Sequence, residues 1–176
     1  MATGDRLWTF ATGIYGRDGV APACLTLQDQ YGQDVLLLLF AAWAGAEGGL
    51  LLSPERTARA SADAADWRND VVEVLRGLRR RLKGAPGAPP GPDVAALREE
   101  VKRIELAAER IALTRLEQTA LPWLDESDRV EGSEAAPRNL TCAFATVAGR
   151  PPDAAAAALL TTIADAAIGW SARRER

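Results

Sequence analysis

The sequence predicts an all-α protein, a single-domain bundle of six or seven helices over residues 1–176, and three observations support this. Apolar residues recur three and four positions apart along most of the chain, which is the period of an amphipathic helix. No segment shows the sustained alternation of apolar and polar residues that marks a β-strand. Proline, glycine and small polar residues stand between the periodic segments, where helices begin and end.

The amino-terminal segment is expected to form three short helices. The apolar stripe of residues 7–14 predicts a first helix capped by Asp5, and the spacing within residues 20–31 predicts a second. Asp34 is expected to cap a third helix, residues 35–46, which is apolar on nearly every side. A membrane-spanning helix needs about 20 apolar residues. This shorter segment is therefore predicted to be a buried core helix, and no transmembrane span is predicted.

Two long helices, about 54–83 and 94–120, are predicted to form an antiparallel hairpin across the Pro/Gly-rich loop 84–92. The first helix has one apolar stripe, with its arginines on the other face. The second has a heptad-like apolar seam. The stripe comprises Trp67, Val71, Val74, Leu75, Leu78 and Leu82, and the seam comprises Val94, Leu97, Val101, Ile104, Ala108 and Ile111.

The carboxyl-terminal third is expected to hold two more helices. Pro122 is predicted to stop the long hairpin helix, and residues 125–136 are predicted to form an acidic loop. A helix is then expected from Pro137 to Ala148. A last, Ala-rich helix is expected to begin after Asp153 and to reach about Trp170.

The composition excludes several kinds of active site. Histidine is absent and cysteine occurs twice, as Cys24 and Cys142. A Ser-His-Asp triad, a Cys-His pair and a Cys/His zinc site within one chain are therefore excluded, and no metal or cofactor is predicted. The net charge of −3 disfavours a strongly basic nucleic-acid-binding protein. Because the amino terminus lacks the pattern of a secretory signal, a bacterial cytoplasmic location is predicted.

One concentrated motif runs from Cys24 to Trp43. It reads Cys-Leu-x-Leu-Gln-Asp-x-x-Gly-x-Asp-Val, followed by Leu-Leu-Phe-x-x-Trp, with a weaker match at 67–79 and a trace at Asn139-Leu140. On these residues the chain resembles a bacterial family of conserved hypothetical proteins, a domain of unknown function. The resemblance covers about half of the chain and implies a helical protein without an assigned activity. Leu36 stands where the motif usually has Asn.

The polar residues of this motif admit two interpretations. In the first, Gln28, Asp29 and Asp34 form a small carboxylate–amide site at a helix corner. In the second, they cap helix ends and bond their orphan backbone groups. Arg68 is a candidate ion-pair partner for Asp29 or Asp34. The candidate aromatic lining of a site comprises Trp8, Tyr15, Trp43 and Trp67.

A basic run near the end of the first hairpin helix is a candidate anion-binding surface. It comprises Arg76, Arg79, Arg80, Arg81 and Lys83. Such a run can grip phosphate, anionic lipid or an acidic partner. The structural alternative is that these cations complement the helix dipole and keep the exposed face solvated.

Three classes of function remain open, and the sequence does not decide whether the chain is an enzyme. The favoured class is a non-catalytic protein-interaction or scaffold module, whose hairpin binds another protein or a second copy. This follows because the hairpin carries more apolar surface than two helices bury alone. The alternatives are a ligand-binding protein or enzyme that uses Gln28, Asp29 and Asp34, and an adaptor that binds anionic surfaces through Arg76–Lys83.

Overall fold

The computed structural model describes residues 5–84, 89–126 and 129–174, and within these ranges it is all-α, as predicted, with no strand. Parts of both predicted loops, residues 85–88 and 127–128, lie outside the described residues. The elements are α1 (Arg6–Tyr15), α2 (Val20–Tyr31), α3 (Val35–Ala46), α4 (Pro54–Trp67), the π-helical segment η1 (Arg68–Val72), α5 (Glu73–Arg81), α6 (Pro92–Glu126), α7 (Gly132–Ala148) and α8 (Ala154–Arg174). Counting α4, η1 and α5, which follow one another without a break, as one helix gives seven in the described ranges.

The chain forms two compact units. The first unit comprises Met1–Asp63 and Leu113–Arg176, and the second comprises Ala64–Ala112. Helices α4 and α6 each contribute residues to both units. The second unit therefore consists of the end of α4, the η1–α5 segment and the first part of α6, which together form the hairpin.

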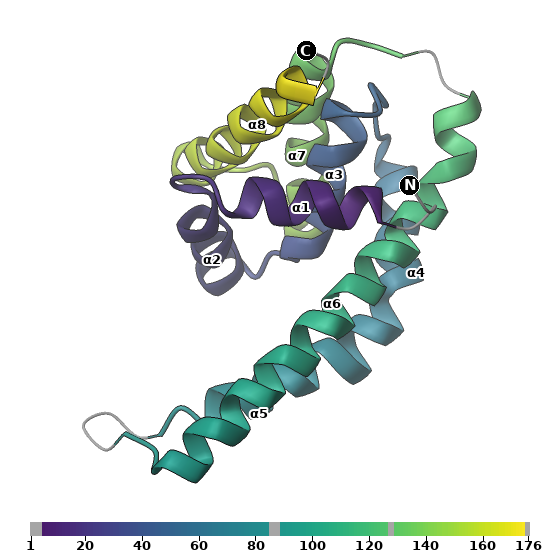
Figure 1. Cartoon of the computed structure of the whole chain (residues 1–176). Helices are drawn as coiled ribbons and strands as arrows, with labels where there is room; N and C mark the ends of the chain where they lie inside the picture. Colours follow the sequence, from purple (N-terminus) through teal and green to yellow (C-terminus); the bar gives the residue numbers. More distant parts are fainter. Residues whose placement is uncertain (1–4, 85–88, 127–128, 175–176) are drawn as a thin grey trace. The chain divides into compact units, whose positions relative to one another are not determined.

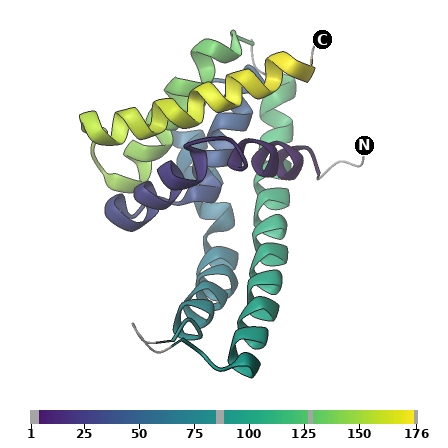
Figure 2. The same cartoon turned by 60° about the vertical axis from the view of Figure 1, so that its left-hand side comes forward.

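Helix α3 forms the centre of the first unit, as its sequence predicts. Ten of its twelve residues are buried, and α1, α2, α7 and α8 pack around it (Figures 1 and 2). The Asp34 side chain caps its first turn by accepting hydrogen bonds from the amides of Leu36 and Leu37, at 3.0 and 3.3 Å. The surrounding helices thus cover an apolar helix that water would otherwise reach.

Helix α7 begins five residues earlier than predicted, so Pro137 lies inside it. The reason is a close approach between α3 and α7. A Cβ atom on Gly45 would lie 2.5 Å from the backbone nitrogen of Ala136, and one on Gly132 would lie 2.7 Å from the carbonyl oxygen of Ala46. Packing at this distance holds the first turn of α7 in place despite the amide that Pro137 lacks.

A fully buried asparagine joins α7 to the segment that follows α3. The side-chain oxygen of Asn139 accepts a hydrogen bond from the Leu52 amide at 2.8 Å. Its nitrogen donates to the carbonyls of Ala41 and Leu50, at 3.2 and 2.8 Å. Asn139 therefore satisfies irregular backbone that would otherwise be buried without partners.

Asp5 lies at the N-cap position of α1, as predicted, but its side chain makes no capping hydrogen bond. Instead the fully buried carboxylate of Glu117, on α6, accepts a hydrogen bond from the Leu7 amide at 3.0 Å. This bond satisfies one of the amides that have no partner within the first turn of α1.

Helix α6 continues through Pro122 to Glu126, so the prediction that this proline stops the helix is wrong. A proline in the last turns removes one backbone hydrogen bond, and side-chain packing offsets that loss here. Leu124 lies against Gly48, and the guanidinium of Arg56 stacks on the Trp123 ring at 5.6 Å from its centre. The predicted acidic loop is correspondingly shorter at both ends.

Helix α8 is the one helix among the described residues that is long and apolar enough to cross a membrane by length and composition. Asp153 caps it by accepting a hydrogen bond from the Ala156 amide at 2.8 Å. Its buried residues, Ala156, Leu160, Ile163, Ala164 and Ala167, form one face, and that face packs in the first unit. The core helix of a globular unit passes the same test of length and composition.

In the second unit, η1 changes which side chains face α6. A π-helical turn holds one more residue than an α-helical turn, so every later residue is rotated by about 100°. Consequently Val72 is the fully buried residue of η1, whereas Val71, the member of the predicted stripe, is half-buried. Of the predicted stripe, Trp67 keeps its contact with α6, but after η1 the arginines Arg76 and Arg79 face α6.

Candidate functional site

The corner between α2 and α3 holds the polar residues of the sequence motif. Gly32 ends α2 in the left-handed conformation, with φ of 64°, and Asp34 then caps α3. Gln28 is half-buried and Asp29 is exposed. Asp34 therefore has the structural position of the second interpretation, and its oxygen is committed to backbone amides.

Two residues within the motif segment, Gln33 and Tyr31, were not singled out from the sequence, and Tyr31 connects this corner to other helices. Gln33 is buried, and its amide nitrogen donates to the Tyr31 carbonyl at 3.3 Å, while its side-chain oxygen has no hydrogen-bond partner. The Tyr31 hydroxyl donates to Asp153 at 3.3 Å, and its ring lies edge-on to Phe144 at 5.8 Å. The corner is thereby attached to α7 and to the start of α8.

The four predicted aromatic residues do not line one cavity. Trp43 is fully buried, Tyr15 is exposed, and Trp8 is half-buried on α1. Trp67 belongs to the second unit, where its indole nitrogen donates to the Ala108 carbonyl at 2.9 Å. Arg68 also lies in that unit, in η1, and its pairing with Asp29 or Asp34 stays a prediction.

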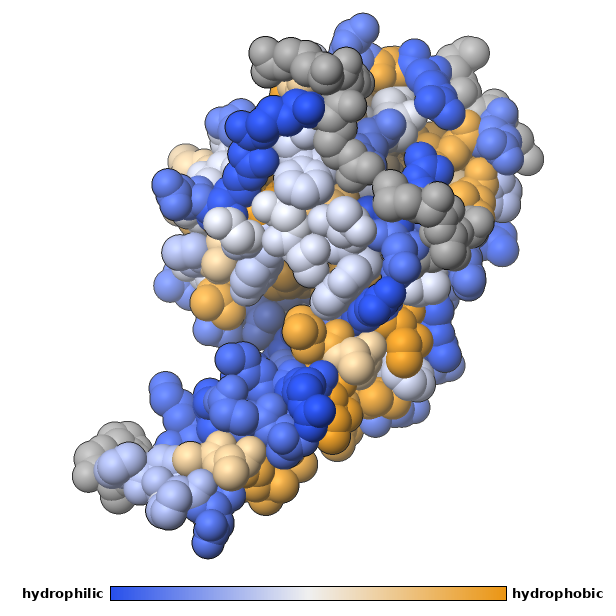
Figure 3. All heavy atoms as spheres, viewed as in Figure 1, coloured by the Kyte–Doolittle hydropathy of each residue, from blue (hydrophilic) through white to orange (hydrophobic). Residues whose placement is uncertain are grey.

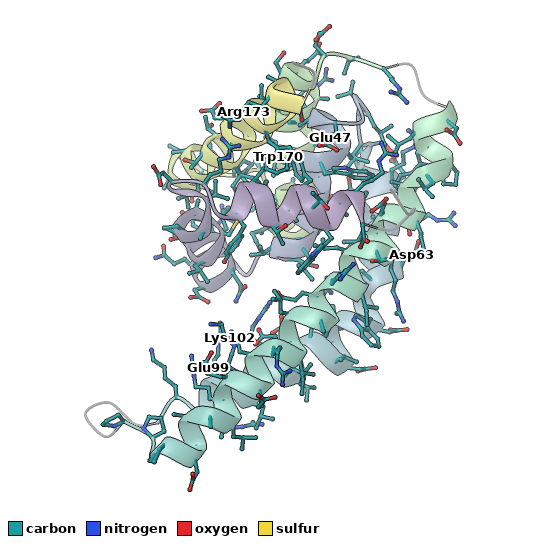
Figure 4. All side chains as sticks on the ribbon, in the orientation of Figure 1. Glu47, Asp63, Glu99, Lys102, Trp170 and Arg173 are labelled. Carbon is teal, nitrogen blue, oxygen red and sulfur yellow. The ribbon has the colours of Figure 1, made fainter. Side chains whose placement is uncertain are left out.

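Glu47 connects two tryptophans in the first unit. Its carboxylate accepts hydrogen bonds from the indole nitrogens of Trp43, at 3.2 Å, and Trp170, at 3.1 Å (Figure 4). The Trp170 ring fills the space that a side chain on Gly13 would occupy and lies beneath the guanidinium of Arg17. In the sequence, the signal for this contact is that Glu47 is a single acidic residue directly after an apolar helix. The arrangement joins α3 to α8.

Three hollows lie among the described residues of the first unit, and one of them, of about 620 Å³, is a mainly apolar groove beside Pro54, Arg138 and Cys142. A cavity of about 100 Å³ adjoins Trp43 and Glu47. A larger open groove, of about 660 Å³, lies beside Arg59, Asp63, Arg115 and Trp123. In it Asp63 accepts a hydrogen bond from the Thr119 hydroxyl at 3.2 Å, and Arg59 lies 3.9 Å away, so one of the cationic side chains already has a carboxylate beside it (Figure 4).

Two members of the predicted anion-binding run are engaged in ion pairs. Arg76 contacts Glu105 at 3.2 Å, Glu109 at 2.7 Å and Glu73 at 2.6 Å. Arg79 is bidentate on Glu105. These arginines are largely covered, in contrast to the solvated face that the sequence suggested. The other members, Arg80, Arg81 and Lys83, are exposed.

The two glutamates of this cluster are held in different electrostatic environments. For Glu105, burial favours the neutral form, but hydrogen bonds and charge from Arg79 and Arg76 outweigh it and lower its pKa. For Glu109, burial dominates over the attraction of Arg76 and raises its pKa. The cluster thus places charges between α5 and α6, where a two-helix hairpin usually buries leucines.

The apolar residues displaced by this arrangement lie on one side of the hairpin. On α5, Leu75 and Leu78 each precede a paired arginine by one residue, about 100° round the helix. On α6, Ile104 and Ile111 lie on the side of the buried Ala108 away from Glu109. Because α5 and α6 run antiparallel, these residues of α5 and these residues of α6 lie on the same side of the hairpin. We call this surface the apolar flank; it comprises Val71, Val74, Leu75, Leu78, Leu82, Leu97, Ile104 and Ile111.

The apolar flank is partly open to solvent, since Val71, Leu75 and Leu82 are half-buried and its other five members are exposed. Of the ten large hydrophobic residues exposed in the described ranges, seven lie in the second unit. In the predicted seam of α6, Val101 and Ala108 are buried, whereas Leu97 is 53% and Ile104 is 54% exposed. Figure 3 shows hydrophobic residues at the surface along the hairpin. Glu99 and Lys102, 3.6 Å apart, pair away from the flank (Figure 4).

The thiol groups and acidic clusters offer little chemistry in the described part of the chain. Burial raises the pKa of the Cys24 thiol to about 12, so it stays protonated and poorly nucleophilic near neutral pH. The half-buried Cys142 lies 3.4 Å from the Thr57 hydroxyl. Within those ranges no three His, Cys, Asp or Glu residues are placed to hold a metal ion.

Comparison with known proteins identifies one family. The model of a family described as "Protein of unknown function (DUF2390)" matches residues 6–116, which include α1 to α3 and the whole second unit. No curated protein and no solved structure matches the chain.

Proposed function

The chain belongs to the family described as Protein of unknown function (DUF2390), and for this member we propose a non-catalytic role as a protein-interaction module whose docking surface is the apolar flank. The observation that carries the proposal is the inverted arrangement of the hairpin. Arg76 and Glu105 lie between the helices, while leucines and isoleucines lie outside.

This arrangement is costly for an isolated hairpin. Taking an ion pair out of water costs more than packing hydrophobic residues of similar volume in the same place. Turning the η1–α5 stripe inward would have buried Val71, Leu75 and Leu78 against α6. The π-helical turn prevents this, and π-helical turns are frequent at functional sites. Large exposed apolar patches on a monomer mark interaction surfaces.

The alternative sites have weaker support. Asp34 bonds to backbone amides, which favours a structural role for the Gln28–Asp34 corner. Arg76 and Arg79 are paired with glutamates, which leaves Arg80, Arg81 and Lys83 as the exposed part of the basic run. A cytoplasmic location in a bacterium stays part of the proposal.

Site-specific photo-crosslinking in living cells tests the proposal. A photoreactive amino acid replaces Ile104, on the flank, or Leu106, which is 50% exposed on the same helix but about 200° round from it. We expect discrete cross-linked products from position 104 that are absent from position 106. These products should disappear when Leu97→Glu places a charge on the flank. Identical patterns from the two positions, or no products from position 104, would overturn the proposal.

A further inference from the structure

We infer that the occupant of the apolar flank is a second copy of this chain, so that two hairpins pack face to face as an antiparallel four-helix bundle. The inference rests on the proposed function, because it names the partner of that same surface.

The shape of the flank fits another hairpin. Its α6 side, from Leu97 to Ile111, has members seven residues apart and runs for about 21 Å. Its α5 side runs antiparallel beside it, so the surface is two helices wide. A single partner helix, about 10 Å across, would cover the middle and leave the outer residues Val74 and Leu78 in water. Val74 is 58% exposed, so it needs cover as much as Ile104 does.

The area of the flank is close to what a stable dimer needs. Five of its side chains are each about half exposed, which amounts to roughly 400 Å² of apolar surface, within the range of the largest patches on monomers. Interfaces are a little over half apolar, so this corresponds to roughly 700 Å² per copy. Standard interfaces bury about 800 Å² per partner.

The charges of the hairpin permit two copies to approach. Residues 64–112 contain ten basic and eight acidic side chains, a net charge of +2, so repulsion between hairpins is weak. At the edge of the flank on α6, Glu100 forms an ion pair with Arg103 of the same helix. This pair places a cation beside the carboxylate that lies one turn from both Leu97 and Ile104. A face of this kind, with heptad spacing on α6, is typical of antiparallel bundles.

Sedimentation velocity of the purified full chain, from about 1 to about 300 μM, tests the inference. We expect a dimer whose dissociation constant lies in the micromolar range. Ile104→Glu, which places one charge per copy on the flank, should weaken the dimer by at least about 30-fold. Leu106→Glu, the matched control on the same helix, should leave the dissociation constant within about twofold.

Leu97→Lys gives a second flank variant, and circular dichroism shows that each variant keeps its helices. A wild-type chain that stays monomeric at the highest concentration would overturn the inference. So would a dimer that Ile104→Glu and Leu106→Glu weaken equally. Cross-linked products from position 104 that contain another protein and never a second copy would also overturn it, while the proposed interaction role would stand.

Discussion

Deletion of Asn69, an exposed residue of η1, tests which face of α5 is turned toward α6. The π-helical turn holds one extra residue, so removing Asn69 lets α4 continue into α5 as a regular α-helix without rotating it. Arg76 and Arg79 would still face Glu105, and Val72 would stay buried. We therefore expect the free energy of unfolding to change by less than about 1 kcal/mol.

The alternative packing, with the apolar stripe against α6, predicts a loss in the free energy of unfolding that can be calculated. If Val71, Leu75 and Leu78 packed against α6 in an uninterrupted α-helix, the deletion would rotate them away by about 100°. Losing the burial of three such side chains, at about 1.5–3 kcal/mol each, would cost roughly 4.5–9 kcal/mol. A loss of that size would refute the claim that Arg76 and Arg79 face α6.

Urea denaturation followed by circular dichroism measures the difference. Deletion of Ala107 is the matched control, since this residue is also exposed but lies in the regular α-helix α6. There the deletion has no extra residue to remove, so it rotates one part of α6 relative to the other. We expect that variant to lose several kcal/mol, because the buried Val101 and Glu105 would rotate away from their partners.

Two further predictions concern buried polar groups. Asn139→Ala leaves the Leu52 amide and the Leu50 carbonyl buried without partners, so we expect it to lower the free energy of unfolding by about 3–5 kcal/mol, against less than about 0.5 kcal/mol for Thr141→Ala, exposed on the same helix. An unchanged urea midpoint for Asn139→Ala would contradict a stabilising role of these hydrogen bonds. Because the pKa of Glu105 is lowered in the folded state, its stabilising contribution is present above its ordinary value of 4.5 and is lost as the pH falls below it. Glu105→Gln should therefore flatten the acid side of the stability profile, and a profile as steep as the wild type's would speak against the pairing with Arg79.

Much of the fold could be predicted because local signals agreed with packing. The uniformly apolar α3 had to be buried, and Asp34, placed directly before it, had to cap it. The boundaries of α6 and α7 were missed because Pro122 and Pro137 are breakers by local rules. At both places a tertiary contact, Leu124 on Gly48 and Ala136 on Gly45, offsets the lost hydrogen bond.

The hairpin shows where periodicity misleads. The stripe from Trp67 to Leu82 has a regular α-helical spacing, and nothing in that spacing reveals that one turn is π-helical. The neighbouring arginines gave a weak signal, since Arg76 and Arg79 have the same spacing one residue later. Which of the two faces meets α6 depends on Glu105 and Glu109, about 30 residues along the chain, and no local rule connects them.

The role of each polar candidate depends on its place in the fold more than on its residue type. Asp34 and Asp29 look alike in the sequence, yet one caps a helix and the other is exposed. No sequence pattern singles out Glu117, although its buried carboxylate accepts a hydrogen bond from the Leu7 amide at the start of α1. Such roles depend on which helix end lies nearby in space, so they become visible once the helices are packed.

A double-mutant cycle between Arg76 and Glu109 tests the central claim most directly, because these side chains meet, at 2.7 Å, only when the charged face of α5 points toward α6. The cycle uses Arg76→Met, Glu109→Gln and the double variant, with stability measured by urea denaturation. For a largely covered pair we predict a coupling free energy of about 1–2 kcal/mol. Additive effects, with coupling below about 0.3 kcal/mol, would contradict an inverted hairpin and remove the reason for an outward apolar flank.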